Sequence, residues 1–128
     1  MLEKEINAIT NVARETNTAA ILFIVQTSEG EIIVQYDNLN SQTIVRFYSA
    51  FPINKSITRK SILNCITRKY GNLKKTPRII IANGIAVVMR ETTLSPIFGY
   101  RNHTATLVNF IDRNIHITLQ YAKCGKEK

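Results

Sequence analysis

The sequence predicts an α+β fold, in which an antiparallel sheet carries two helices on one face. Three pairs of apolar segments are each joined by a short polar turn, as in β-hairpins. Two other segments repeat apolar residues at the spacing of one helical face. The chain has 128 residues, the length of one domain. We expect the order αβββαββββ, with one domain over 1–122 and a flexible tail over 123–128.

The first half of the chain predicts one helix and three strands. Residues 2–16 form the helix, because their apolar side chains share one face: Leu2, Ile6, Ile9, Val12 and Ala13. Glu3 and Glu5 suit its first turn, where the helix dipole favours negative charge. The strands follow at 19–27, 31–37 and 42–50, separated by polar turns. Pro52 ends the third strand.

The second half predicts a basic helix and two more hairpins. The helix covers 56–70, with Ser56 as its N-cap, Gly71 as its stop, and an apolar stripe of Ile62, Leu63, Ile66 and Tyr70. Asn83-Gly84 between two apolar runs is typical of a type I′ hairpin turn. Residues 92–102 read as a loop. A last hairpin pairs 104–111 with 115–121 across the turn Asp112-Arg113-Asn114.

The acids and bases are distributed unevenly along the chain. The net charge is +8, but the stretch Asn38–Arg90 has no acid and contains ten bases, whereas the other residues hold seven bases and nine acids. Such a positive sector attracts polyanions and can neutralise phosphates. The same excess of bases would also suit solubility alone, a protein partner with an acidic face, or an anionic membrane surface, but we favour a polyanion as the partner.

These observations predict a non-enzymatic protein that binds nucleic acid, RNA or single strands in preference, with little regard to sequence. The helix at 56–70 and the loop after it would contact phosphates, and aromatic side chains such as Tyr48 or Tyr70 would contact bases. The expected nucleic-acid-binding residues are Arg46, Tyr48, Lys55, Arg59, Lys60, Arg68, Lys69, Lys74, Lys75 and Arg78.

An alternative is a structural or regulatory interaction module. Such a protein would self-associate through its apolar hairpins, as a homodimer, and dock an acidic partner. Known nucleic-acid modules do not decide the question, because the chain lacks the Gly-x-x-Gly loop of a KH domain and the aromatic run of an RRM.

One short motif points to catalysis instead. His116-Ile117-Thr118-Leu119 resembles the H-x-T-x element of the 2H phosphoesterases, in which a strand presents an imidazole and a hydroxyl on one face. The resemblance implies a phosphodiesterase-like enzyme with His116 and Thr118 as catalytic residues. That family uses two such elements, and after His103 the position that requires a hydroxyl is Ala105. A phosphodiesterase is therefore the second alternative.

Cysteines, histidines and glycines predict neither a metal site nor a cofactor. No metal-ligand spacing is present, and the five glycines do not cluster into a phosphate-binding loop. Cys65 and Cys124 without a CxxC spacing give no disulfide framework, so we expect a reducing, cytoplasmic compartment. The acidic N-terminus is unlike a signal peptide, and the longest apolar run, Ala19–Val25, is too short to span a membrane.

Overall fold

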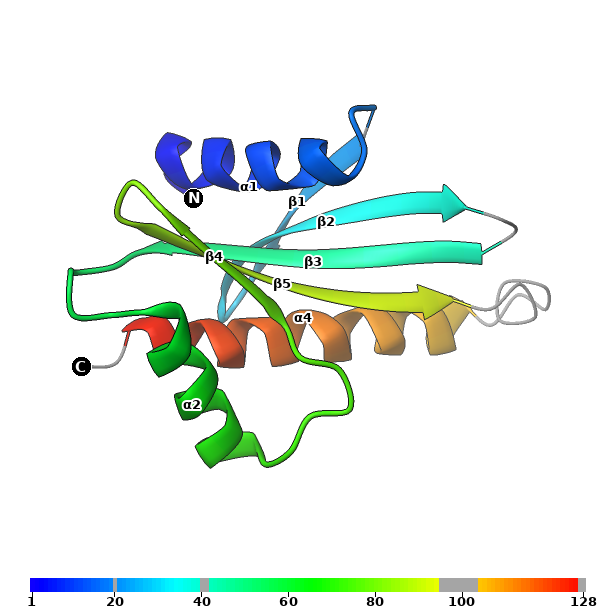
Figure 1. Cartoon of the computed structure of the whole chain (residues 1–128). Coiled ribbons are helices and arrows are strands. Elements are labelled where there is room, and N and C mark those ends of the chain that lie inside the picture. The colour runs from blue at the N-terminus through cyan, green and yellow to red at the C-terminus, as the bar shows by residue number, and fades with distance from the viewer. Residues whose placement is uncertain (20, 40–41, 95–103, 127–128) are drawn as a thin grey trace.

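A computed structural model of the chain describes residues 1–19, 21–39, 42–94 and 104–126. These residues form an antiparallel sheet of five strands in the order β1-β2-β3-β5-β4, together with three helices (Figure 1). The elements are α1 (Glu3–Thr16), β1 (Ile21–Thr27), β2 (Gly30–Leu39), β3 (Gln42–Pro52), α2 (Arg59–Tyr70), β4 (Arg78–Ala82), β5 (Ile85–Leu94) and α4 (Thr104–Lys126). The α+β class predicted from the sequence is confirmed.

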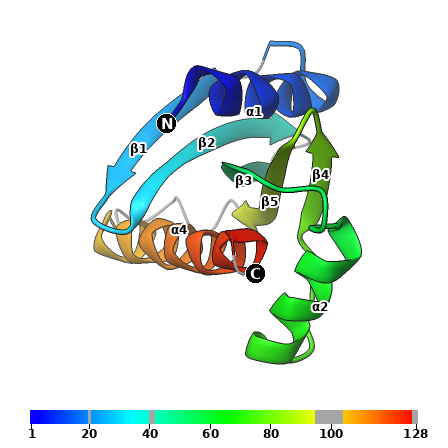
Figure 2. The same cartoon turned by 90° about the vertical axis from the view of Figure 1, so that its left-hand side faces the viewer.

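The central strands β3 and β5 are covered on both faces of the sheet. Helix α1 packs on one face and α4 runs along the other, so the fold has three layers (Figures 1 and 2). On the α1 side, Ile9 and Val12 belong to one core with Tyr48 and Val87. Successive residues of a strand face opposite sides of the sheet, so burial of successive residues means that neither side of the central part of β3 is exposed to solvent. The expectation of helices on one face only is wrong.

Helix α4 occupies the segment in which we expected a hairpin over 104–111 and 115–121. Its inward side chains recur at helical spacing: Ile115, Leu119 and Ala122. Asn114, expected in the turn of that hairpin, lies inside the helix, where its amide donates to the Phe110 carbonyl at 2.8 Å. The same side chain accepts a hydrogen bond from Arg90 of β5 at 2.9 Å. The hairpin prediction is wrong. It was based on the β-branched residues and on a turn-like tripeptide, whereas the inward side chains follow the spacing of a helix.

The end of α4 is part of the core. We expected a flexible tail from residue 123, but Cys124 and Gly125 are buried and the helix continues to Lys126. A Cβ atom added at Gly125 would overlap the ring of Phe51 on β3. Only a glycine therefore allows α4 to lie this close to the sheet.

The local signals around α2 and the last hairpin are largely as expected. Asn83 and Gly84 have φ angles of 53° and 74°, so the predicted type I′ turn between β4 and β5 is confirmed. Helix α2 ends at Gly71, with a φ of 78°, as predicted. It begins at Arg59 rather than residue 56, because Thr58 and Ser61 form a reciprocal capping box and Ser56 does not cap it. The loop expected at 92–102 starts within β5, and its remainder lies outside the described residues.

The contact between Gly125 and Phe51 gives a stability prediction. Gly125→Ala should destabilise the protein by about 1–3 kcal/mol, because the added methyl group forces α4 away from β3. Alanine is otherwise the better helix former, so propensity alone would raise stability. Urea unfolding measures the change, and Lys123→Ala, at an exposed position of the same helix, is the control. A Gly125→Ala variant as stable as the wild type would show that α4 does not require this close approach.

Candidate nucleic-acid interface

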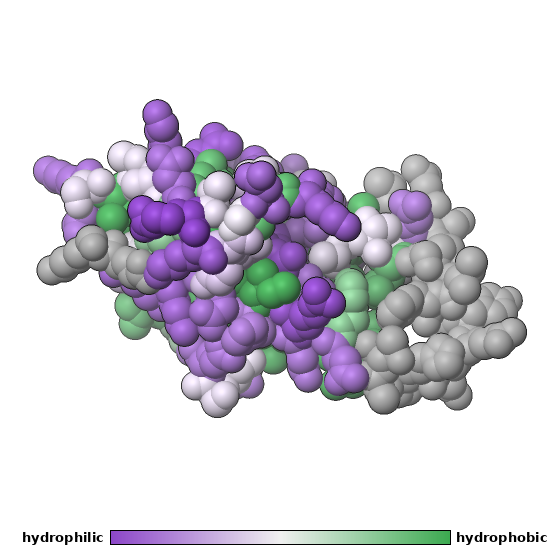
Figure 3. Space-filling view, turned by 90° about the horizontal axis from the view of Figure 1, so that it is seen from below, coloured by the Kyte–Doolittle hydropathy of each residue, from purple (hydrophilic) through white to green (hydrophobic). Residues whose placement is uncertain are grey.

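The exposed bases of α2, of the loop after it and of the start of β4 form one candidate surface. We call this set the basic surface; its residues are Arg59, Lys60, Arg68, Lys69, Lys74, Lys75 and Arg78, and all seven are exposed. Lys55, in the loop before α2, is exposed as well. In the view from below, hydrophilic side chains dominate the region where α2 is nearest to the viewer (Figure 3).

The helical spacing of α2 determines which side chains point outward. Ile62, Cys65 and Ile66 are buried in the core formed with α4 and β4. At 100° per residue, Lys60 and Arg68 then project from the opposite side. The predicted apolar stripe of α2 changes in one respect, because Cys65 takes the place expected for Tyr70.

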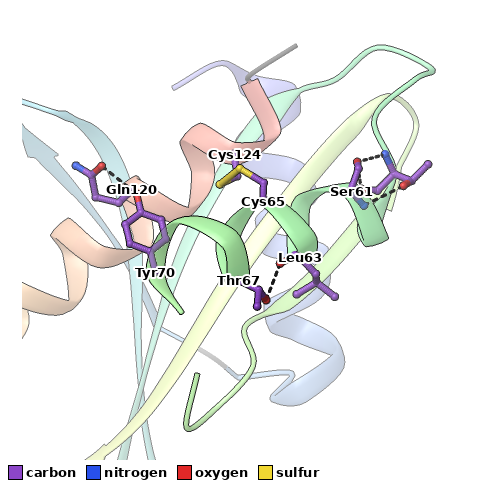
Figure 4. The surroundings of a disulfide bond; sticks show 8 residues. Ser61, Leu63, Cys65, Thr67, Tyr70, Gln120 and Cys124 are labelled. Atoms are coloured by element: carbon purple, nitrogen blue, oxygen red, sulfur yellow. Dashed lines mark hydrogen bonds between the residues drawn. A yellow bond between two sulfur atoms is a disulfide. The ribbon is translucent and has the colours of Figure 1, made fainter. Parts of the chain in front are cut away.

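A disulfide between Cys65 and Cys124 joins α2 to α4 (Figure 4). The two Cα atoms are 5.7 Å apart, and both residues are buried. The expectation that the cysteines form no disulfide is wrong, because it placed Cys124 in a tail instead of in a helix next to α2. Apart from α4, the main contact of α2 is with β4, so this bond helps to hold the basic helix in place.

Two bases of the basic surface lie next to acids. Lys75 lies 3.7 Å from Glu91, and Arg78 lies 3.9 Å from Glu15. Within the described residues, no acid forms an ion pair with Arg59, Lys60, Arg68 or Lys74. Exposed ion pairs contribute about 0–1 kcal/mol, so Lys75 and Arg78 can exchange their acids for phosphate groups at little cost.

Two residues that we expected in the interface are buried in the sheet. Arg46, 5% exposed, lies 3.2 Å from Asp37 and 3.6 Å from Glu91. The Tyr48 hydroxyl donates a hydrogen bond to Gln35 under α1, and burial raises the pKa of Tyr48 to about 12. Neither side chain can stack on a base, because both are buried and helices α1 and α4 cover the two faces of the sheet at β3.

Arg46 does adjoin a hollow at the margin of the basic surface. The hollow has a volume of about 210 Å³ and is lined by Thr16, Arg46, Lys75, Thr76, Arg78, Met89 and Glu91. Each of the three bases in this lining has an acidic partner: Arg46 lies next to Asp37 and Glu91, Lys75 next to Glu91, and Arg78 next to Glu15.

Tyr70 is an exposed aromatic residue at the end of α2. It is 42% exposed, and its ring centroid lies 5.3 Å from that of Tyr121. Its hydroxyl donates to Gln120 at 3.3 Å (Figure 4). These contacts hold the ring against α4, and Tyr70 directly follows Arg68 and Lys69 in the chain. The exposed ring of Tyr70 is therefore accessible to a base, whereas the buried ring of Tyr48 is not.

The structure separates the two residues of the phosphodiesterase motif. His116 and Thr118 lie on a helix, not on a strand, and residues two apart on a helix do not share a face. Thr118 is buried and its hydroxyl donates to the Asn114 carbonyl at 2.8 Å. His116 is exposed, 2.7 Å from Glu29, and this hydrogen bond lowers the pKa of that carboxyl. His103 lies outside the described residues. The prediction that His116 and Thr118 present an imidazole and a hydroxyl on one face is therefore wrong.

Comparison with protein-family models, with curated proteins and with solved structures finds no match to this chain. In the part of the chain that the structure describes, no group of three or more His, Cys, Asp or Glu side chains is arranged to hold a metal ion. Among the same residues, none of the helices is both long and apolar enough to cross a membrane.

The disulfide gives a second stability prediction. It closes a loop between residues 59 positions apart, for which the chain-entropy model gives a stabilisation of about 4 kcal/mol. The double variant Cys65→Ala/Cys124→Ala should lose about this free energy of unfolding in urea. Reduced wild type should behave in the same way. An unfolding midpoint that does not change when thiol titration shows complete reduction would contradict the role given to this bond.

Proposed function

We propose that this protein binds nucleic acid without catalysis and with little sequence preference, RNA or single strands being favoured, and that the basic surface is the binding site. The observation that carries the proposal is the exposure of seven bases between residues 59 and 78, of which Arg59, Lys60, Arg68 and Lys74 form no ion pair with an acid of the described residues. Unpaired bases at this density attract the phosphate backbone of any sequence.

The placement of the exposed bases favours contacts with the phosphate backbone of a nucleic acid. Lys60 and Arg68 project from the outer side of α2, and Lys74 follows in the loop. Tyr70 supplies a ring on which one base can stack, and stacking of this kind tolerates every base. Arg46 and Tyr48 are not part of the proposed site, and Lys55 extends it on the other side of the Thr58 cap.

Partners and location complete the proposal. The alternative partner is an acidic protein, which the same surface would attract. Competition between unlabelled RNA and the endogenous partner distinguishes nucleic acid from an acidic protein. We do not propose a phosphodiesterase, because His116 and Thr118 lie on different sides of α4. An intracellular location accords with nucleic acid as the partner, although the Cys65–Cys124 disulfide does not support a reducing compartment.

Binding should depend on salt in a predictable way. About four simultaneous phosphate contacts on a single strand give a slope of log K against log salt of about −3. Removing two contacts with Lys60→Ala/Arg68→Ala should reduce the slope to about −1.5 and weaken binding about 25-fold at 0.1 M salt. Fluorescence anisotropy with two unrelated oligonucleotides measures both quantities, and both sequences should be affected equally.

The matched control removes the same charge from the opposite face of the sheet. Lys4→Ala/Arg14→Ala changes one exposed lysine and one exposed arginine of α1, which packs on the other side from α2. This variant should keep the wild-type slope. Equal losses in the two double variants would mean that net charge alone attracts the polyanion, and the basic surface would then be no site.

Tyr70 tests the stacking contact separately from the charges. Tyr70→Leu should weaken binding to single strands by about 1–3 kcal/mol, because a stacked base is lost. The salt slope should not change, since no phosphate contact is removed. A control on duplex DNA, whose bases are not free to stack, should show little effect. Equal weakening on single strands and duplex would contradict stacking on Tyr70.

A further inference from the structure

Strand β1 forms one edge of the sheet, and its residues Ile21–Thr27 include no charge, no proline and no bulge. Its only neighbour within the sheet is β2, so part of its backbone N–H and C=O groups face away from the sheet. Natural edge strands are usually protected by charges, a proline or a bulge. β1 reads ILFIVQT, with no charge and no proline, and its seven residues pair with β2 in unbroken register.

Apolar side chains of β1 are exposed on both faces of the sheet. Ile21, Phe23 and Ile24 are 65%, 49% and 54% exposed. Phe23 contacts Tyr36 of β2 edge to face, with ring centroids 5.9 Å apart, and Tyr36 is exposed as well. An uncharged apolar edge of this kind is a site for pairing with another strand.

Strands β1 and β2 carry no base. No Lys or Arg occurs between Arg14 and Arg46, a stretch that contains the whole of β1 and β2. The basic surface lies instead on α2 and next to β4, which forms the opposite edge. Contact through β1 therefore keeps the basic surfaces of two copies, each with a net charge of +8, away from each other.

We infer that β1 pairs antiparallel with β1 of a second copy, giving a homodimer with one continuous sheet. A two-fold axis at Ile24, the middle residue of β1, places Phe23 opposite Val25 of the copy and Ile24 opposite Ile24. All of these positions are apolar, so the strand is complementary to itself. A partner of other sequence is not needed to explain the edge.

This dimer would have ten strands and one α4 from each copy on the same face. The two copies of β4, and with them the two basic surfaces, would lie at the two far ends of the sheet. The inference does not rest on the proposed function, because it uses neither the bases of α2 nor any ligand.

The test is the mass of the full chain in solution without nucleic acid. Sedimentation equilibrium at tens of micromolar should give twice the 14.5 kDa of one chain. Ile24→Lys, which places two lysines opposite each other at the axis, should give a monomer with an unchanged circular dichroism spectrum. Phe23→Lys should do the same and serves as a second variant if the first does not fold.

The matched control is Ile81→Lys, an exposed isoleucine on the opposite edge strand, which should remain a dimer. A monomeric wild type would overturn the inference, and a chain that then pairs with a different protein through β1 would assign the edge to that partner. Dissociation by Ile81→Lys but not by Ile24→Lys would place the interface at β4. None of these results depends on whether the protein binds nucleic acid.

Discussion

Strands β3 and β5 pair in register from Thr43 with Leu94 to Pro52 with Ile85, and their central residues are buried from both sides. A strand pair of this kind needs cover on both faces, which α1 and α4 supply. Because α4 covers β3, it also brings Cys124 to α2, and the disulfide then holds the basic helix at the β4 side. The position of the candidate interface thus follows from the burial of the central strands.

Local signals in the sequence were sufficient to predict the secondary structure of most of the first 94 residues. The apolar face of α1, the turn at Asn83-Gly84 and the stop at Gly71 each rest on short-range geometry, which a sequence shows directly. The segment 104–126 is different, since its Ile, Val and Thr residues favour strands while their spacing favours a helix. Contact with β3 and β5 decides between them, and the disulfide and the role of Gly125 could be recognised only after α4 was in place.

The candidate site was predictable where it depends on one helix and unpredictable where it depends on the sheet. The spacing of Ile62 and Ile66 was enough to indicate that Lys60 and Arg68 are exposed. A base and an aromatic residue on one strand, such as Arg46 and Tyr48, are typical of a nucleic-acid-binding strand. Whether these side chains are exposed depends on how distant segments pair and pack around that strand, which the sequence does not show. The two sheet edges differ for the same long-range reason: β1 is apolar and free of bases, whereas β4 adjoins the basic surface.

The central claim is that nucleic acid contacts the protein through the surface formed by residues 59–78. Amide chemical shifts, followed by NMR while a single-stranded oligonucleotide is added to the isotope-labelled chain, test this claim most directly. The account predicts that the shifts that change belong to α2, to the loop after it and to the first residues of β4, with Tyr70 among them. Changes confined to α1 or to β1, or no changes at all at saturating oligonucleotide, would contradict it.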